Sequence, residues 1–158
     1  MSRTLATLSH MERLLFLRKV RLFSMLPPRD LQPIAAIAEE HAYADGDTIA
    51  EQGDPGDAMH IIVRGAVSVI VRTEAGQHVV AVRSSGDVVG DMAVVTSEPR
   101  MAGLVARGDV RVLSIGRPQF ESILRERPAI ALGVIRVLCQ RLAESSAVDG
   151  TGTTATPA

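Results

Sequence analysis

The spacing of apolar residues predicts helices at the two ends of the chain. Residues 9–23 interleave leucines, two phenylalanines and a valine with basic residues, which is the pattern of an amphipathic helix. Ser9 and Glu12 have the spacing of a reciprocal N-terminal cap, so this helix is expected to begin there. Pro27 and Pro28 end or bend it, and Pro28 suits the first turn of a second helix. That helix continues to about Glu40, with apolar residues at helical spacing.

The middle of the chain has a different pattern. From His41 to about Gly116, short β-branched runs separated by Gly, Asp and Pro recur every 8–12 residues, as in a sandwich or barrel. Polar and apolar residues alternate most clearly in residues 67–72 and 110–115, as expected for half-buried strands. Eight strands fit a jelly roll. They are predicted near residues 41–44, 47–51, 58–64, 66–72, 77–83, 87–89, 102–107 and 109–115.

Helical spacing returns after Pro118 and again after Pro128. One stripe of the last helix contains Ile130, Val134, Leu138 and Leu142, and a second apolar set contains Ala131, Ile135 and Cys139. A helix with two apolar faces either packs wholly on the other helices or covers two surfaces, one of them a partner helix. The predicted fold is therefore α+β: an eight-stranded β jelly roll (double-stranded β-helix) with N-terminal helices and a C-terminal helix pair.

Composition narrows the function classes. In 158 residues, 46% are apolar and 22% charged, which suits one globular module, and only 3% are aromatic, with no Trp. The core must be aliphatic, and the aromatic platforms of single-strand nucleic-acid binders are missing. The formal charge is −1, so there is no basic excess to attract a phosphate backbone. We therefore expect no nucleic-acid binding by this chain alone.

Several chemistries find no support in the sequence. The lone Cys139 lies in an apolar helical setting, which predicts a buried, reduced thiol and a cytoplasmic location. Residues 129–135 form the longest apolar run, too short to insert in a membrane. No two of the four histidines are closer than eighteen residues, which disfavours a metal site, and no nucleophile elbow indicates an enzyme. Arginine far outnumbers the single lysine, which suggests a GC-rich bacterial source.

Candidate chemistry concentrates in residues 88–102. Gly90 permits a tight turn, and the residues after it could form one helical turn whose free N–H groups point at an anion. Arg100, after Pro99, could return a guanidinium to the same place and bind a phosphate in bidentate fashion. Asp91 would then face a ligand hydroxyl, because a phosphate would repel it. From spacing alone, Arg100 could instead pair with Glu98 or Asp91, and Asp91 could cap the short helix.

Residues 51–69 and 88–102 together resemble the cyclic nucleotide-binding domain family, of the catabolite-activator and protein kinase A regulatory-subunit type. The similarity covers about residues 22–142. The first stretch resembles the family's glycine-rich turn, strand and second glycine, in which Gly53, Gly56 and Gly65 imply scaffold turns. The second resembles its phosphate-binding cassette, Gly-Glu-Leu-Ala followed by Pro-Arg-Ala or Pro-Arg-Ser/Thr. The resemblance implies a ligand-binding set of Gly90, Asp91, Met92, Ala93, Arg100 and Met101.

Within that set, the resemblance implies backbone contacts from Gly90 and Ala93 to the cyclic phosphate and a salt bridge from Arg100. Two residues depart from the family pattern. Asp91, at the position of the ribose-binding glutamate, is one methylene shorter, and Met101 replaces a small or hydroxylated residue. Met101 offers no hydroxyl to guanine, so cAMP is expected to be preferred over cGMP, the other candidate ligand.

The expected function is a regulatory module, not an enzyme, that senses cAMP and relays it by movement of the C-terminal helices. The alternative is a degenerate domain without ligand that serves in protein interaction or dimerisation. A catabolite-activator type transcription factor would need a helix-turn-helix after the long helix, where only a short tail remains. The terminal helices could join a homodimer or an attached effector domain. The expected organisation is an N-terminal helical segment or linker at 1–21, the binding domain at 22–146 and a disordered tail at 147–158.

Overall fold

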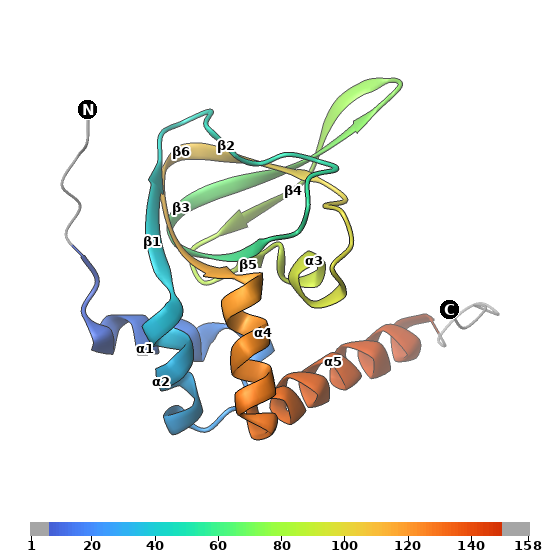
Figure 1. The fold of residues 1–158 in the computed structure, drawn as a ribbon. Helices are drawn as coiled ribbons and strands as arrows, with labels where there is room; N and C mark the ends of the chain where they lie inside the picture. Colours follow the sequence, from blue (N-terminus) through green and yellow to red (C-terminus); the bar gives the residue numbers. More distant parts are fainter. Residues whose placement is uncertain (1–6, 150–158) are drawn as a thin grey trace.

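The N-terminal helices pack together on one side of the sheet (Figure 1). In the computed structural model, which describes residues 7–149, α1 spans His10–Lys19. It begins at the predicted cap, where the Ser9 hydroxyl accepts from the Glu12 N–H and the Glu12 carboxylate accepts from the Ser9 N–H, both at 3.2 Å. The 3₁₀ turn η1 (Arg21–Phe23) follows, so the first helix is shorter than expected. Helix α2 spans Pro28–Ile37 and ends before Glu40, because strand β1 has already begun.

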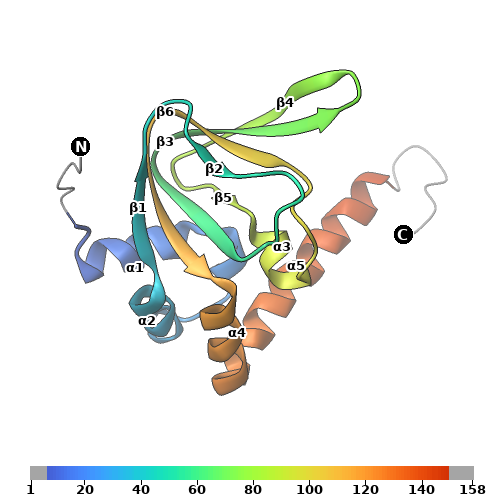
Figure 2. The same cartoon turned by 45° about the horizontal axis from the view of Figure 1, so that its top comes forward.

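The strands form one antiparallel sheet that curls into an open roll (Figure 2). The hydrogen-bonded order is β1-β6-β3-β4, with β2 paired to β6 and β5 paired to β3. The sheet is not closed, so β1 and β4 are edges, and the β3–β4 hairpin projects beyond the body of the molecule. The strands are β1 (Glu39–Tyr43), β2 (Thr48–Ala50), β3 (Ala58–Thr73), β4 (Gly76–Ser84), β5 (Val88–Val89) and β6 (Gly103–Gly116).

The six observed strands include all eight predicted segments, because β3 and β6 each contain two of them. Gly65 lies inside β3 and Gly108 inside β6, both at positive φ, and they bend the strands without ending them. The register between β3 and β6 shifts on both sides of Arg64. A Cβ on Gly65 would lie 2.3 Å from the carbonyl oxygen of Asp109, so the two bends nest against each other. The jelly-roll architecture is confirmed, with longer, bent strands.

The apolar core has two parts. The larger part joins the helices to the sheet and includes one aromatic pair, Phe23 and Phe120, with ring centroids 6.2 Å apart. Leu17 and Val20, at the end of α1, are fully buried in it. The second part fills the inside of the roll and consists of aliphatic residues, as the composition predicted. Its buried members are Ile62, Val67, Val89, Leu104, Ala106, Val110 and Val112.

The C-terminal pair consists of α4 (Arg117–Glu126) and α5 (Pro128–Asp149). Only the first half of α5 is packed: Ile130 and Val134 are buried, whereas Leu142 is 68% exposed. The predicted stripe therefore fails at Leu142, because the helix extends beyond the other elements (Figure 1).

Cys139 is exposed, so the expectation of a buried thiol is wrong. Val137, two positions earlier, faces the core, and a helix turns about 100° per residue, so Cys139 points away from it.

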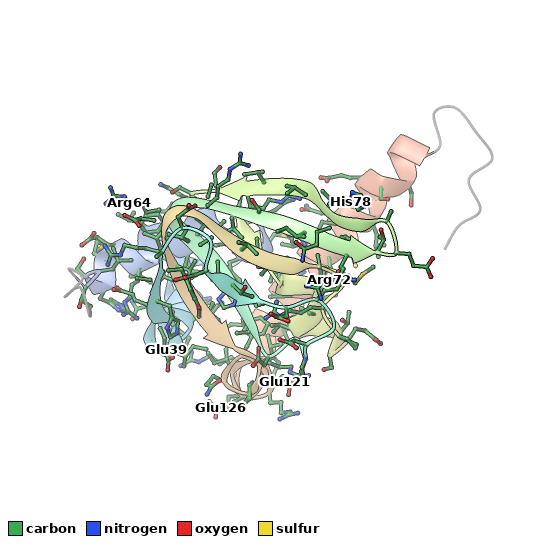
Figure 3. All side chains as sticks on the ribbon, turned by 90° about the horizontal axis from the view of Figure 1, so that it is seen from above. Glu39, Arg64, Arg72, His78, Glu121 and Glu126 are labelled. Atoms are coloured by element: carbon green, nitrogen blue, oxygen red, sulfur yellow. The ribbon has the colours of Figure 1, made fainter. Side chains whose placement is uncertain are left out.

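Seen from above, Arg72 and His78 lie toward the projecting end of the β3–β4 hairpin, and Arg64 lies toward the opposite end of the roll (Figure 3). Within residues 7–149, no helix is long and apolar enough to cross a membrane. Most of the predicted tail at 147–158 lies outside the described residues.

Candidate functional site

The cassette predicted from the sequence forms a short helix between the roll and α5. Strand β5 ends at Val89, and Gly90 turns the chain with a φ of 79°, a conformation that favours glycine. Helix α3 (Asp91–Thr96) then makes the predicted helical turn. It ends at Ser97, whose φ of 60° makes it the one non-glycine residue at positive φ in the described chain. The chain returns through Pro99 and Arg100 to the start of β6.

The glycine-rich turn at residues 53–57 contacts the cassette through backbone hydrogen bonds and close packing. Gly53 N–H donates to the Arg100 carbonyl and Arg100 N–H donates to the Asp54 carbonyl, each at 2.8 Å. A Cβ on Gly56 would lie 2.3 Å from the Cβ of Ala93, so only glycine lets α3 approach this closely. The two sequence motifs are therefore one structural unit, in which the first motif positions the second.

Arg100 is buried at the centre of this unit. The side chain belongs to a residue only 5% exposed, and Nη2 donates to the Ala58 carbonyl oxygen at 2.6 Å. The nearest carboxylate oxygen recorded for it is Oδ1 of the exposed Asp57, 3.6 Å from Nη2 and beyond a normal hydrogen bond. The guanidinium does not pair with Glu98 or Asp91, which was the alternative left open by spacing alone. A buried cation held by a neutral carbonyl and a distant carboxylate is suited to receive an anion.

Gly90 leaves space for this guanidinium. A Cβ at Gly90 would lie 2.4 Å from Nη1 of Arg100, so the turn and the arginine occupy adjoining space. The backbone of the turn and the arginine side chain therefore lie side by side, and their joint recognition of a phosphate stays a prediction.

Asp91 does not act as the cap of the short helix, which was the alternative left open by its spacing. It is the first residue of α3, and no side-chain hydrogen bond caps the helix at Gly90. Instead, its Oδ2 accepts from Nη1 of Arg141 on α5 at 3.1 Å. Both side chains are partly exposed, Asp91 by 16% and Arg141 by 30%. The acid of the cassette is thus already joined to the C-terminal helix.

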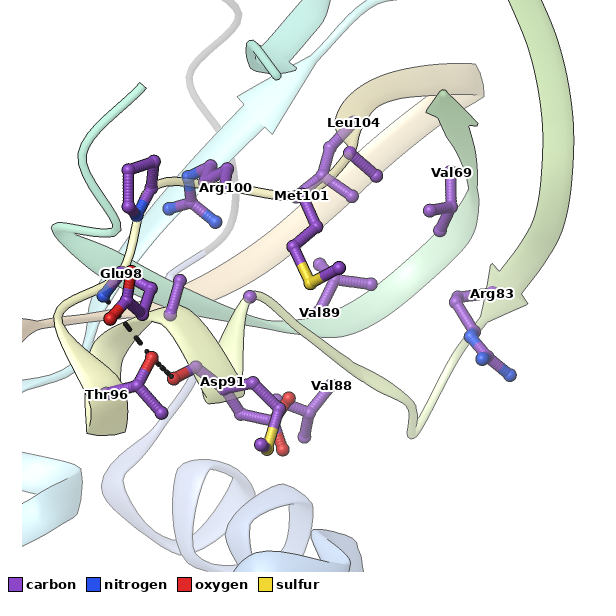
Figure 4. Close-up of a pocket in the computed structure, with 15 residues that line it drawn as sticks. Val69, Arg83, Val88, Val89, Asp91, Thr96, Glu98, Arg100, Met101 and Leu104 are labelled. Carbon is purple, nitrogen blue, oxygen red and sulfur yellow. Dashed lines mark hydrogen bonds between the residues drawn. The ribbon is translucent and has the colours of Figure 1, made fainter. Parts of the chain in front are cut away.

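A pocket of about 420 Å³ opens beside the cassette, within the range of about 300–1,000 Å³ usual for small-molecule sites. All six residues predicted from the sequence line it, with Met101 88% exposed at the rim (Figure 4). Most of the rest of the wall also belongs to segment 88–102, but the part that comes from β3, β4 and β6 was missed by sequence reasoning. That part consists of Val69, Arg83 and Leu104.

Alternation along β3 could have found Val69, but not its distance from the cassette, which depends on the curl of the sheet. Arg141 could not have been found either, since no pattern relates α5 to the cassette.

His60 is a buried polar residue beside the site. Its Nδ1 lies 2.7 Å from the Ser114 hydroxyl, and it pairs across the sheet with Val89. Burial, which is the larger cause, and the positive charge of Arg100 together lower the pKa of His60 to about 4. The imidazole is therefore neutral at neutral pH. No group of three potential metal ligands occurs in residues 7–149.

The comparison with known families agrees with this geometry. Residues 40–127 match the sequence model of the cyclic nucleotide-binding domain. The chain belongs to the cyclic nucleotide-binding domain family. The resemblance seen in the sequence is confirmed, and the matched region runs from β1 to the end of α4.

The curated relatives of this chain include regulatory subunits of cAMP-dependent protein kinases. The cAMP-dependent protein kinase regulatory subunit of Colletotrichum orbiculare is 35% identical over 109 residues, 69% of this chain and 27% of that protein. The chain thus spans about a quarter of the length of this relative.

Two solved structures are similar over most of the chain. The N-terminal domain of a Streptomyces coelicolor transcriptional regulator has a TM-score of 0.78 and 25% identity, covering 89% of this chain and 99% of that one. The regulatory subunit of a cAMP-independent protein kinase A from Trypanosoma brucei has a TM-score of 0.70 and 26% identity, covering 84% and 46%.

Proposed function

We propose that this chain is a regulatory, non-catalytic module that binds cAMP in the pocket beside α3 and relays binding to α5. The observation that carries the proposal is the setting of Arg100, a buried guanidinium at a pocket wall whose recorded side-chain partners are a carbonyl and a carboxylate 3.6 Å away. A cyclic phosphate would supply the charge-assisted hydrogen bonds that this cation lacks. The family to which the chain belongs supports the choice of ligand.

The proposed position of the ligand follows from charge and polarity. The cyclic phosphate lies against Arg100 and the backbone of Gly90 and Ala93. Asp91 accepts a hydrogen bond from a ribose hydroxyl, because a carboxylate beside the phosphate would be repelled. The purine then extends over the apolar wall, where Val69, Val89 and Leu104 line the pocket and Met101 stands at the rim.

The proposed relay runs through Asp91. Its carboxylate is shared between the pocket and Arg141, so a ribose hydroxyl would compete with the guanidinium. A ligand moves a helix only if it binds the two positions with different affinity. Competition for Asp91 supplies that difference, because cAMP would bind best where Arg141 has left the carboxylate.

A second candidate is a domain that has lost its ligand and acts in protein interaction or dimerisation. The pairing of Asp91 with Arg141 favours it, because the acid already has a partner. From the sequence we still expect a cytoplasmic location, a bacterial source, and an effector domain or a second copy at the terminal helices. These expectations are compatible with both candidate functions.

Calorimetric titration with cAMP, supported by thermal unfolding, separates the two candidates. Cyclic AMP should bind with a Kd in the micromolar range or below, and Arg100→Ala should weaken binding by about 2–5 kcal/mol, the usual effect of truncating one partner of a buried charge pair. Arg72→Ala is the matched control, because Arg72 does not line the pocket. Absence of heat and of thermal shift at millimolar cAMP would contradict the proposal. Unchanged affinity with lowered stability in Arg100→Ala would make Arg100 a structural residue.

A further inference from the structure

A second cavity, of about 300 Å³, lies on the other face of the sheet from the candidate binding pocket. Val69 and Leu104 pair across β3 and β6 and line the pocket beside the cassette. The neighbouring pair, Ile70 and Gly103, lines the second cavity. Successive residues of a strand point to opposite faces, so the two cavities lie back to back across one piece of sheet. They share no lining residue.

One part of the second cavity is apolar. Its wall contains the half-buried side chains of Ala50, Ile70 and Val105. Gly103 is not at positive φ, and a Cβ there would meet its nearest atom, the Ala50 carbonyl oxygen, at 3.5 Å, which is ordinary contact. Neither the backbone nor the packing therefore requires a glycine at this position. Its effect is to leave room above β6 for another molecule.

Two opposite charges stand together at the polar end of the cavity. The Arg72 N–H donates to Oε1 of Gln52 at 2.6 Å, and Nε2 of Gln52 donates to the Arg72 carbonyl oxygen at 3.4 Å. These bonds hold Glu51, the residue before Gln52, at the same end as Arg72. Both residues line the cavity and are exposed. Within residues 7–149, neither the carboxylate of Glu51 nor the guanidinium of Arg72 forms a hydrogen bond or ion pair.

We propose that this cavity binds a small aliphatic α-amino acid. The carboxylate of the ligand pairs with Arg72, its ammonium group pairs with Glu51, and its side chain lies over Ile70 and Val105. An anion attracted by Arg72 is repelled by Glu51, and a cation meets the reverse, whereas a zwitterion is attracted by both. An α-amino acid carries its two charges on one carbon, which suits charges that stand at one end of the cavity.

Size and polarity narrow the ligand further. A cavity of about 300 Å³ is at the lower limit of small-molecule sites, which suits a molecule of about the size of leucine. The apolar wall favours an aliphatic side chain over a polar one. The proposal does not depend on a cyclic nucleotide, because the two cavities have separate walls. Binding of leucine should therefore persist when cAMP is present.

Titration of L-leucine into the isotope-labelled full chain, followed by amide chemical shifts, tests the proposal. The shifts should move at Ile70, Gly103 and Val105 and saturate with a Kd in the millimolar range, because both charges are exposed to water. Two analogues isolate the charges: isocaproate is leucine without the ammonium group, and isoamylamine is leucine without the carboxylate. Each should bind about fivefold more weakly than leucine.

Three variants assign the contacts. Glu51→Gln should bind leucine and isocaproate equally, and Arg72→Gln should bind leucine and isoamylamine equally, because each variant lacks the charge that distinguishes the pair. Gly103→Val should abolish binding, because its methyl groups occupy the cavity and a β-branched residue suits a strand. Glu74→Gln is the control for the charge changes, since Glu74 is exposed in the hairpin turn and does not line the cavity. Thermal unfolding checks that the variants remain folded.

Three results with the unaltered chain would overturn the proposal. One is the absence of saturable shifts at Ile70, Gly103 and Val105. Another is equal affinity for leucine, isocaproate and isoamylamine, which would show that the paired charges select nothing. The third is a set of shifts confined to residues 88–102, which would place leucine beside the cassette. None of these results contradicts the proposed function, which calorimetry with cAMP tests separately.

Discussion

Arg141 of α5 donates a hydrogen bond from Nη1 to Oδ2 of Asp91, the first residue of α3, at 3.1 Å. The two residues are fifty positions apart in the chain, and their contact joins the cassette to the half of α5 that packs least on the rest of the molecule. Because Asp91 also lines the pocket, one carboxylate serves both the candidate binding site and the helix. We expect this shared carboxylate to couple them.

Arg141→Met should remove the competition for Asp91 and tighten cAMP binding by up to about fivefold, since a partly exposed ion pair contributes at most about 1 kcal/mol. The free energy of unfolding should fall by no more than that amount. Calorimetric titration and urea unfolding measure the two effects. Arg136→Met is the control, because Arg136 is exposed on the same helix. Weaker cAMP binding in Arg141→Met than in this control would show that Arg141 supports the site.

Gly90→Ala should abolish detectable cAMP binding, because the new Cβ would lie 2.4 Å from Nη1 of Arg100 and displace the guanidinium. Gly86→Ala provides a matched control: Gly86 also has a positive φ, of 92°, but a Cβ there meets no atom within 4 Å. Both variants should lose about 1 kcal/mol of stability from backbone strain, whereas only the first should lose affinity. Equal affinities in the two variants, measured by calorimetry, would show that the phosphate does not bind at the Gly90 turn.

Much of the fold could be predicted from local pattern. The cap at Ser9 and Glu12, the strand-rich middle and the helical restart at Pro118 depend on residues close in sequence. The division into eight strands was too fine, because Gly65 bends a strand that continues, and spacing alone does not distinguish a bend from a turn. Cys139 was misplaced for a related reason: apolar neighbours indicate a buried helix only where another element covers it.

The candidate site was partly predictable too. The cassette residues are consecutive or nearly so, and the motif brings Gly90 and Arg100 to one place. Arg83 and Arg141 reach the same site through the curl of the sheet and the direction of α5, which no local pattern encodes. The contact that the relay requires is therefore a product of tertiary structure.

The stability of the folded chain should fall as the pH is lowered from about 6.5 toward 4. His60 has a pKa of about 4 in the folded protein, chiefly because it is buried, and an ordinary value of 6.5 when unfolded. Between these values the unfolded chain binds the proton and the folded chain does not, so stability is complete above 6.5. It decreases by about 3 kcal/mol at the acid end.

Urea unfolding between pH 4 and 7 measures this dependence. His60→Gln should flatten the curve over that interval, because glutamine does not titrate. His78→Gln is the control, since His78 is exposed on the projecting hairpin. A curve of equal slope in His60→Gln and the unaltered chain would assign the acid sensitivity to other groups.

Hydrogen exchange with and without cAMP tests most directly whether the chain is a sensor. We predict slower exchange across residues 90–102, where the ligand binds, and faster exchange in the second half of α5, where Arg141 is released from Asp91. Both changes should follow the same dependence on cAMP concentration. Slower exchange at 90–102 with unchanged exchange throughout α5 would show that cAMP binds without moving α5, and the chain would then not be a sensor of the proposed kind.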